Sequence, residues 1–430
     1  MSSLSEIILD GQERALVCGV RRHLPYELVP GKALVCVGVR RCGKSTLLDQ
    51  VMEKLSRDGV SRQNMLYVNF FDDRLDPQRH GRIGDVIETY FELYPQRRGR
   101  EKVYCFLDEI QMVDNWEPFV DRLLRAENCE VFLTGSSSRM LSKEIATQMR
   151  GRGVTWELFP FSFREYLDRR DVAHGPLSSR LRSRIQQCFG EFWERGGFPE
   201  VADMSSRLRV MTHQEYFRTI VHRDVVERND AAHPQAVLDI ALRLINQVGS
   251  MYSVNALTGY VKSLGHKATK TFVGDCVGWL HDAYALFPVK IFHPSASVQN
   301  ANTRKIYCAD HAMIRSVSSG ILVNAGHLLE NLIFTHLRSI TDRLHYYRTA
   351  NGREVDFIWQ PEGREWELVQ VCETLAPPDT RKRELSSLQE AMRERHAGEA
   401  TIVTRDDDET VETADGVIRV IPAWRYLLET

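Results

Sequence analysis

The 430-residue sequence lacks any apolar run close to the ~18 residues that a membrane-spanning helix needs. Its first residues also lack the apolar core of a secretory signal peptide, since the charged residue Glu6 comes early. The nine cysteines include no Cys-x-x-Cys pair and no Cys/His spacing typical of a zinc site. We therefore expect a soluble protein of the reducing cytoplasm, with no membrane partner.

A strong charge of either sign is also missing, because the formal net charge is −2. Binding to nucleic acid through a global basic field is therefore excluded, and any such contact must come from local basic runs. The sequence contains no internal repeat and no low-complexity tract. With 43% hydrophobic and 27% charged residues it has the balance of a globular protein, and its length predicts about two or three domains.

Short apolar runs with β character occupy 33–38, 64–70, 103–107, 131–135 and 154–159. Helical patterns separate them, such as "NWEPFVDRLLRAE" at 115–127. This alternation predicts an α/β fold with a parallel sheet. From about 160 to 285 the periodicity is almost wholly helical, 292–305 reads as a loop or boundary, and 306–430 returns to mixed helix and strand.

The stretch "GVRRCGKST" at 38–46 fits the phosphate-binding pattern G-x-x-x-x-G-K-[ST], and it follows an apolar strand and precedes a helix. Glycines let consecutive backbone N–H groups converge on phosphate at a helix N-terminus. Lys44 is expected to reach the β and γ oxygens, and the Ser45 hydroxyl to bind Mg²⁺. The predicted ATP-binding residues here are Gly38, Arg41, Cys42, Gly43, Lys44, Ser45 and Thr46.

Two carboxylates end the apolar run of "VYCFLDEIQ", at the strand edge where ligands collect in open α/β sheets. Asp108 is expected to hold Mg²⁺ through water, and Glu109 to act as the general base on the attacking water. A kinase needs no second carboxylate for water activation, so Glu109 favours hydrolysis. In the following strand, "VFLTGSSSRML", Ser136 and Ser137 are candidate sensors of the γ-phosphate, although TGSSS also fits a plain turn.

Seven motifs in order, "GVRRCGKSTLL", "YVNFFDDRL", "LDEIQ", "TGSSSRML", "GRGVTWELFPFSFREYL", "GGFPEV" and "HRDVVERN", resemble the AAA+-like P-loop ATPases of archaea and bacteria that carry a C-terminal domain related to restriction endonucleases. The resemblance implies a P-loop ATPase domain at 1–165, a helical lid at 166–235, a winged helix at 236–292 and a nuclease-like domain at 306–430. It also implies an oligomer, with a hexamer favoured, and ATP and Mg²⁺ as ligands.

The resemblance further implies roles for residues outside the phosphate loop. Gly197 and Pro199, in "GGFP", lie where such families contact adenine, although a helix-ending turn explains the same residues. Arg152 is the first candidate for an arginine supplied to a neighbouring subunit. Arg223 is the second, as a lid sensor or the same finger. Surface salt bridges are the alternative for both arginines.

The segment 238–292 has the order helix, short helix, glycine turn, helix, apolar strand, which is the layout of a helix-turn-helix with a wing. Lys262, Lys267 and Lys270 cluster around the turn and the start of the second helix, where phosphate contacts would form. The alternative is a packing module that touches no DNA.

The tail resembles the PD-ExK nuclease fold, in which a helix Glu, a strand Asp and an E-x-K pair bind metal and activate water. Glu330 and Asp356 match that pattern, but Gln370 and Cys372 stand at the E-x-K positions. Gln carries no charge for Mg²⁺, and Cys cannot supply the positive charge of a lysine. We expect a folded, hydrolytically inactive module.

Together these features predict Mg²⁺-dependent ATP hydrolysis by an oligomeric AAA+-like ATPase that acts on or binds DNA, duplex or branched. The alternative is a nucleotide-gated signalling switch that binds another protein and does not translocate DNA. A nuclease powered by ATP is disfavoured by Gln370 and Cys372.

Overall fold

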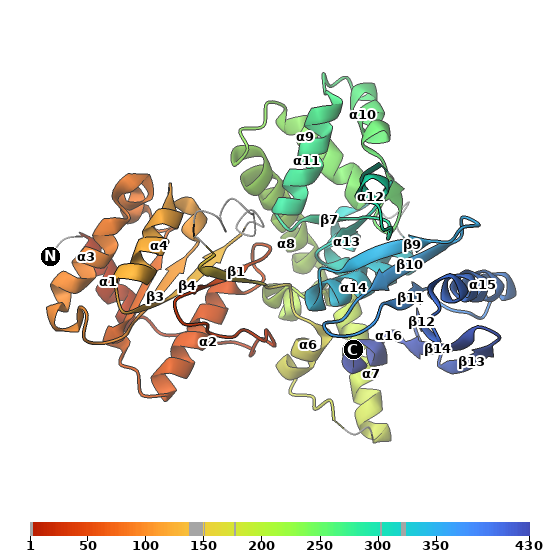
Figure 1. The fold of residues 1–430 in the computed structure, drawn as a ribbon, viewed down its shortest axis with the longest axis horizontal. Coiled ribbons are helices and arrows are strands. Elements are labelled where there is room, and N and C mark those ends of the chain that lie inside the picture. The colour runs from red at the N-terminus through yellow and green to blue at the C-terminus, as the bar shows by residue number, and fades with distance from the viewer. Residues whose placement is uncertain (1–2, 137–148, 150, 176–177, 302, 320–323) are drawn as a thin grey trace. The chain divides into compact units, whose positions relative to one another are not determined.

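The computed structural model describes residues 3–136, 149, 151–175, 178–301, 303–319 and 324–430. These residues divide into two compact units, Met1–Leu158 and Phe159–Thr430 (Figure 1). The sequence had predicted four domains, with the first boundary at 165. Within the described residues, no helix combines the length and apolar character that crossing a membrane requires.

The first unit is built on a five-stranded sheet in the order β2-β3-β4-β1-β5, in which all neighbouring pairs are parallel. Its elements are α1 (Ser3–Glu13), β1 (Ala33–Val37), α2 (Lys44–Arg57), β2 (Met65–Asn69), α3 (Gly84–Leu93), β3 (Val103–Asp108), α4 (Trp116–Ala126), β4 (Cys129–Gly135) and β5 (Gly153–Glu157). All five residues of β1 are buried, as expected for a central parallel strand. The five predicted strands are thus confirmed, and the parallel sheet brings the ends of β1, β3 and β4 to one edge.

The second unit begins with helices and continues into a three-stranded sheet in the order β6-β8-β7. The elements of this part are α6 (Phe163–Arg169), α7 (Ser179–Arg195), α8 (Ser206–Thr219), the π-helical segment Ile220–Glu227, α9 (Pro234–Ile245), β6 (Met251–Tyr252), α10 (Val254–Ser263), α11 (Lys270–Asp282), β7 (Leu286–Val289), α12 (Ala296–Ala301), β8 (Arg304–Cys308) and α13 (His311–Val317). β8 pairs antiparallel with both other strands.

This pairing corrects the reading of 292–305 as a loop. The segment contains α12 and the start of β8, and the last predicted domain, from 306, begins inside that strand. In β8, Lys305 and Tyr307 share one face while Ile306 lies on the other, so the run has the period of a strand. Because β8 begins with the charged residues Arg304 and Lys305, the sequence shows no apolar strand pattern there.

The rest of the second unit is a six-stranded mixed sheet in the order β13-β14-β12-β11-β10-β9 (Figure 1). Its elements are α14 (Ala325–Ile340), β9 (Leu344–Arg348), β10 (Glu354–Trp359), β11 (Glu367–Val371), α15 (Pro378–Arg395), β12 (Glu399–Thr404), β13 (Glu409–Thr413), β14 (Gly416–Pro422) and α16 (Ala423–Glu429). One buried cluster joins the sheet to α15, with Val355 and Ile402 on strands and Leu388 on the helix. The tail is therefore a folded module with its own core.

Candidate functional site

The loop between β1 and α2 can be built only with glycine at its two ends. Gly38 has φ +155°, and a Cβ there would lie 2.1 Å from the carbonyl oxygen of Leu158. Gly43 has φ +103° and stands directly before the first residue of α2. Both backbone conformations disfavour any side chain, so the glycine spacing in the sequence sets the shape of the loop.

Lys44 lies over this loop rather than in solvent. Its ammonium donates to the carbonyl oxygens of Gly38 at 3.1 Å and Val39 at 3.2 Å, and only 4% of the residue is exposed. Burial alone would lower the pKa of Lys44, but the nearby Cys42 and Glu109 outweigh that effect and raise it. The ammonium is therefore held charged at the centre of the loop.

The other predicted loop residues differ in exposure. Arg41 is exposed with φ +66°, Cys42 is fully buried, and Thr46 is half-buried. The buried Arg22, which belongs to none of the sequence motifs, donates to the carbonyl oxygen of Cys42 at 2.6 Å. The chain preceding β1 thus braces the phosphate loop from outside, a contact for which a lone arginine gives no signal in the sequence.

Asp108 ends β3 in a fully buried position that is surrounded by hydroxyl and amide donors. Tyr67 donates to its carboxylate at 2.9 Å and Asn69 at 3.3 Å, both from β2. Thr134 and Ser45 donate to the same carboxylate. Burial raises the pKa of Asp108, and the hydrogen bond from Thr134 partly offsets this. The two predicted metal ligands, Ser45 and Asp108, therefore touch.

Glu109 is turned away from its strand by a left-handed backbone, with φ +56°. Its N–H donates to the Thr134 hydroxyl at 2.9 Å, and its carboxylate accepts from the side-chain amide of Gln111. Gln111 also donates to Ser136 at 3.4 Å. The predicted base and the predicted sensor are thus linked through Gln111, whereas Ser137 lies outside the described residues.

Arg152 lies at the N-terminal ends of the strands, whereas the phosphate loop lies at the C-terminal end of β1. Its carbonyl accepts from the N–H of Ala33, the first residue of β1, at 2.7 Å, whereas the loop begins after Val37. Its guanidinium is 3.1 Å from the carboxylate of Asp121 on α4. Arg152 therefore cannot serve the site of its own chain. Its ion pair with Asp121 matches the salt-bridge alternative, and a role toward a neighbouring chain stays a prediction.

The two glycines of "GGFP" are fixed by packing within the second unit. Gly196 has φ +78°, and a Cβ there would lie 2.4 Å from the carboxylate of Asp310. The N–H of Gly197 donates to Asp310 at 2.6 Å, and a Cβ there would lie 2.5 Å from the carbonyl oxygen of Phe161. Close packing thus accounts for both glycines without a ligand.

Two further predicted nucleotide contacts, Pro199 and Arg223, also lie in the second unit. Pro199 begins a short 3₁₀ turn, Pro199–Asp203. Arg223 is exposed on the π-helical segment after α8. Their roles at adenine and γ-phosphate stay predictions, as does that of Gly197.

The three lysines predicted to contact DNA are all exposed. Lys262 lies in the last turn of α10, and Lys270 is the first residue of α11, which Thr269 caps. Lys267 lies in the connection between these helices. The structure therefore places the three side chains around one helix-turn-helix connection.

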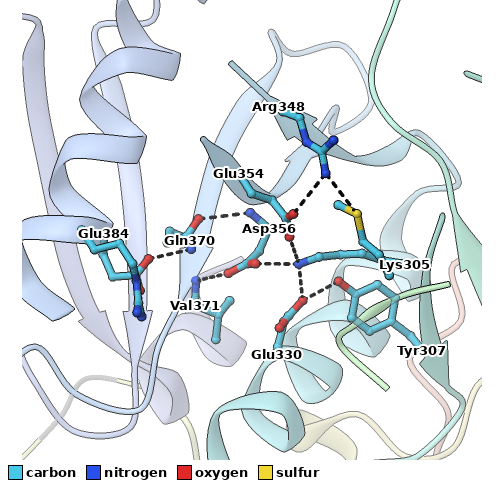
Figure 2. Close-up of polar contacts among 11 residues, drawn as sticks. Lys305, Tyr307, Glu330, Arg348, Glu354, Asp356, Gln370, Val371 and Glu384 are labelled. Carbon is cyan, nitrogen blue, oxygen red and sulfur yellow. Dashed lines mark hydrogen bonds and ion pairs between the residues drawn. The ribbon is translucent and has the colours of Figure 1, made fainter. Parts of the chain in front are cut away.

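The C-terminal part of the second unit brings acidic residues together around a lysine (Figure 2). The ammonium of Lys305, on β8, lies 2.8 Å from Glu330 and 2.7 Å from Asp356. Sequence reasoning missed Lys305 because it lies before the predicted domain. The available signal was that Lys305 and Tyr307, two residues apart, lie on the same face if this segment is a strand.

Gln370 and Cys372, at the positions predicted to match E-x-K, supply no second cation. The side-chain oxygen of Gln370 accepts from the N–H of Asp356 at 3.1 Å, and its amide nitrogen donates to Glu384 at 2.8 Å. Cys372 is largely buried, and burial raises the pKa of its thiol to about 12. An open pocket of about 840 Å³ lies over these residues.

Comparison with known proteins adds three domain assignments. Residues 30–167 match the family described as AAA domain. Residues 186–321 and 325–426 match two domains of unknown function, DUF8612 and DUF4143. The first unit therefore contains an AAA domain, and its parallel sheet and phosphate loop are those of a P-loop NTPase.

Among solved structures, the chain is similar to the Walker-type ATPase PABY2304 of Pyrococcus abyssi, with 13% identity, a TM-score of 0.40, and coverage of 74% of this chain and 95% of that one. It is also similar to the Aeropyrum pernix ORC1 protein in complex with DNA, with 16% identity, a TM-score of 0.31, and coverage of 74% and 91%.

Two uncharacterized proteins match over longer stretches of sequence. A protein of Haemophilus influenzae is 27% identical over 75% of this chain and 78% of its own length. The uncharacterized protein MJ1544 of Methanocaldococcus jannaschii is 30% identical over 98% of this chain and 94% of its own length. With its AAA domain followed by two domains of unknown function, the chain belongs to the same family as MJ1544.

Proposed function

We propose that this chain is a Mg²⁺-dependent ATPase of the AAA+ type. The observation that carries the proposal is the contact between the phosphate loop and the acidic strand end. Ser45, at the start of α2, bonds to Asp108, and Thr134 joins Asp108 to Glu109. A P-loop hydrolase needs these groups beside one another, because phosphate, metal and attacking water meet there.

The residues fit a magnesium ion through the Ser45 hydroxyl and the Asp108 carboxylate, which are hard oxygen ligands. Bound there, Mg²⁺ would neutralise charge on the phosphate oxygens. Lys44 adds a fixed positive charge from the loop itself. The backbone N–H groups of the loop orient the triphosphate toward the strand end that carries Glu109.

Glu109 is the proposed general base. Its backbone is held by Thr134 and its carboxylate by Gln111, so the group has a defined position beside the metal-binding Asp108. A kinase would transfer phosphate to a substrate hydroxyl and would not need this additional carboxylate. Gln111, through its bond to Ser136, connects the base to the strand end proposed to sense the γ-phosphate.

The direct test is Glu109→Gln in the full chain. Removing the base should lower the rate of phosphate release by about 100-fold or more, while affinity for ATP stays close to native. The matched control is Glu92→Gln, an exposed glutamate on α3 in the same unit, which should leave the rate unchanged. Native turnover in Glu109→Gln with Mg²⁺ present would refute the proposal.

We further propose that the segment from α9 to β8, which contains the three-stranded sheet, is a winged helix that contacts duplex or branched DNA. The order α9, β6, α10, α11, β7, α12, β8 supports this, as do the three exposed lysines around the α10–α11 connection. Phosphate contacts in such modules come from basic side chains at helix starts and turns. Because net charge is −2, binding should be local and salt-sensitive.

The alternative function is a nucleotide-gated switch that binds another protein. It is favoured by the near-neutral charge and by the tail, whose E-x-K positions hold Gln370 and Cys372 and which we propose to be inactive as a nuclease. ATP turnover measured with linear, forked and junction DNA separates the two. A DNA-acting ATPase should be accelerated severalfold, whereas a switch should not respond and should retain ADP on purification.

The remaining roles belong to the assembled enzyme in the cytoplasm. We propose a homo-oligomer, with a hexamer favoured, in which Arg152 or Arg223 reaches the nucleotide of a neighbouring chain. Gly197 and Pro199 are proposed to lie against the adenine. Arg223 is exposed, which supports a contact with a neighbouring chain. Arg152 would have to break its ion pair with Asp121 before it could bind phosphate.

A further inference from the structure

The carboxylate cluster of the C-terminal module is centred on the ammonium of Lys305 (Figure 2). Glu354 lies 2.8 Å from the same nitrogen, in addition to Glu330 and Asp356. An ammonium has three N–H donors, and three carboxylates surround this one. Its hydrogen-bonding capacity is therefore filled by acidic groups alone.

Three of the carboxylate oxygens around Lys305 have donors within the protein. One oxygen of Asp356 accepts from Lys305, and the other accepts from the N–H of Val371 at 3.0 Å. The Glu330 oxygen that accepts from Lys305 also accepts from the hydroxyl of Tyr307 at 2.6 Å. Mg²⁺ requires several oxygens that converge at about 2.1 Å, and here they converge on nitrogen at hydrogen-bonding distance.

The position next to Asp356 that would carry a third charged ligand is also unsuitable. Gln370 faces Glu384 with its amide nitrogen and offers its oxygen to the backbone of Asp356. Among the residues that the structure describes, no three His, Cys, Asp or Glu side chains are arranged to hold a metal ion. While the ammonium of Lys305 occupies the centre of the cluster, the metal implied by the nuclease-like fold therefore does not fit these residues.

Burial makes the lysine indispensable to this arrangement. Lys305 is 2% exposed, and its neighbours Glu330 and Asp356 are 6% and 7% exposed. Buried carboxylates without a counter-ion are strongly destabilising. Burial alone would lower the pKa of Lys305, but Asp356 and Glu330 raise it well above its usual value. The lysine is thus a permanent cation at this point.

We propose that the ammonium of Lys305 takes the place of a divalent metal ion, so that the nuclease-like site of the native protein is permanently closed to Mg²⁺. The cation comes from β8, in the three-stranded sheet, whereas the acidic groups come from α14 and β10. Lys305 therefore offsets part of the negative charge of the cluster and links the two sheets of the second unit. This inference does not depend on ATP hydrolysis, so its failure and that of the ATPase proposal are distinguishable.

The test measures Mn²⁺ binding by electron paramagnetic resonance, without nucleotide and in the full chain. An Asp108→Asn background removes metal binding at the phosphate loop. With Lys305 intact we expect no Mn²⁺ bound at the C-terminal module. If the Asp108→Asn protein binds one Mn²⁺ per chain, and adding Asp356→Asn abolishes that binding, the proposal is overturned. This measurement requires no substitution at Lys305.

The converse experiment removes the ammonium. Lys305→Ala, or Lys305→Met if the smaller residue does not fold, should lower the unfolding temperature and create a site for one Mn²⁺. Mn²⁺ should then restore about 5 °C or more to the variant and leave the native protein unchanged. Adding Glu330→Gln should abolish that rescue. The control Lys382→Ala, an exposed lysine on α15, should show no response. A folded Lys305 variant that gains no Mn²⁺ would also overturn the proposal.

Discussion

Thr134 connects the two acidic residues of the phosphate site with a single hydroxyl. The hydroxyl accepts from the N–H of Glu109 and donates to the carboxylate of Asp108, and no part of the residue is exposed. Thr134→Val keeps the volume and the β-branched shape but removes both hydrogen bonds. The matched control is Thr134→Ser, which keeps the hydroxyl.

The cost of Thr134→Val follows from the two broken contacts. A hydrogen bond to a charged group contributes about 1.5–3 kcal/mol, and a buried N–H left unsatisfied costs about 1–3 kcal/mol. Since the two share one hydroxyl and are not additive, we expect a loss of about 2–4 kcal/mol in the free energy of unfolding of the first unit. For a unit of this size that is a fall of roughly 4–16 °C in unfolding temperature.

Turnover should fall as well, because Thr134 fixes the backbone of the proposed base. A misplacement that costs about 1.4 kcal/mol in the transition state gives about a tenfold loss of rate. Scanning calorimetry and phosphate release are the assays, with Thr134→Ser close to native in both. If Thr134→Val unfolds at the native temperature and hydrolyses ATP at the native rate, the hydroxyl does not couple Asp108 to Glu109.

Two further predictions concern the second unit. Gly197→Ala should destabilise this unit by more than 1 kcal/mol, because its Cβ would meet the carbonyl oxygen of Phe161 at 2.5 Å, and unchanged unfolding would contradict that close packing. Burial, with Asp356, raises the pKa of Glu330 to about 7 from 4.5. The native state therefore keeps a proton that the unfolded chain has lost, so the free energy of unfolding should fall as pH rises from about 4.5 to 7. Glu330→Gln should flatten this dependence in denaturant titrations between pH 5 and 8, and an unaltered slope would exclude Glu330 as its source.

The phosphate site was largely predictable because its residues follow local rules. Gly38, Lys44, Asp108 and Glu109 each occupy a fixed place relative to the end of a strand or the start of a helix. An apolar run identifies the strand, so the position of the polar residue after it follows. The structure brings these residues together, while their roles in hydrolysis stay predictions.

The partners that hold these residues were not predictable in the same way. Thr134 and Asn69 reach Asp108 from neighbouring strands, and Arg22 reaches the loop from 20 residues away in the sequence. Such contacts depend on strand order and register, which apolar periodicity does not specify. Thr134 in particular lies in a polar stretch that reads equally well as a turn.

The C-terminal site shows a second limit of local reading. Glu330 and Asp356 were predicted from the resemblance to the PD-ExK fold, which placed a lysine two residues after Gln370. The structure instead places the ammonium of Lys305, 51 residues before Asp356, among the carboxylates. The interaction with the carboxylates depends on where the charged nitrogen lies, not on which strand carries it. A lysine on a distant strand can therefore fill this position, and a linear motif does not predict it.

The position of Arg152 constrains any assembly that uses it as a finger. The arginine lies beside the first residue of β1, and the phosphate loop follows the last, about 13 Å further along the strand. The N-terminal and C-terminal ends of the strands face in opposite directions. A two-fold dimer contact, which pairs the same surface on both chains, would therefore not bring Arg152 of one chain to the phosphate loop of the other. Successive chains must instead meet head to tail, through unlike surfaces that either close into a ring or continue as a filament. A chain at the open end of such a row would hold one nucleotide that no neighbour completes.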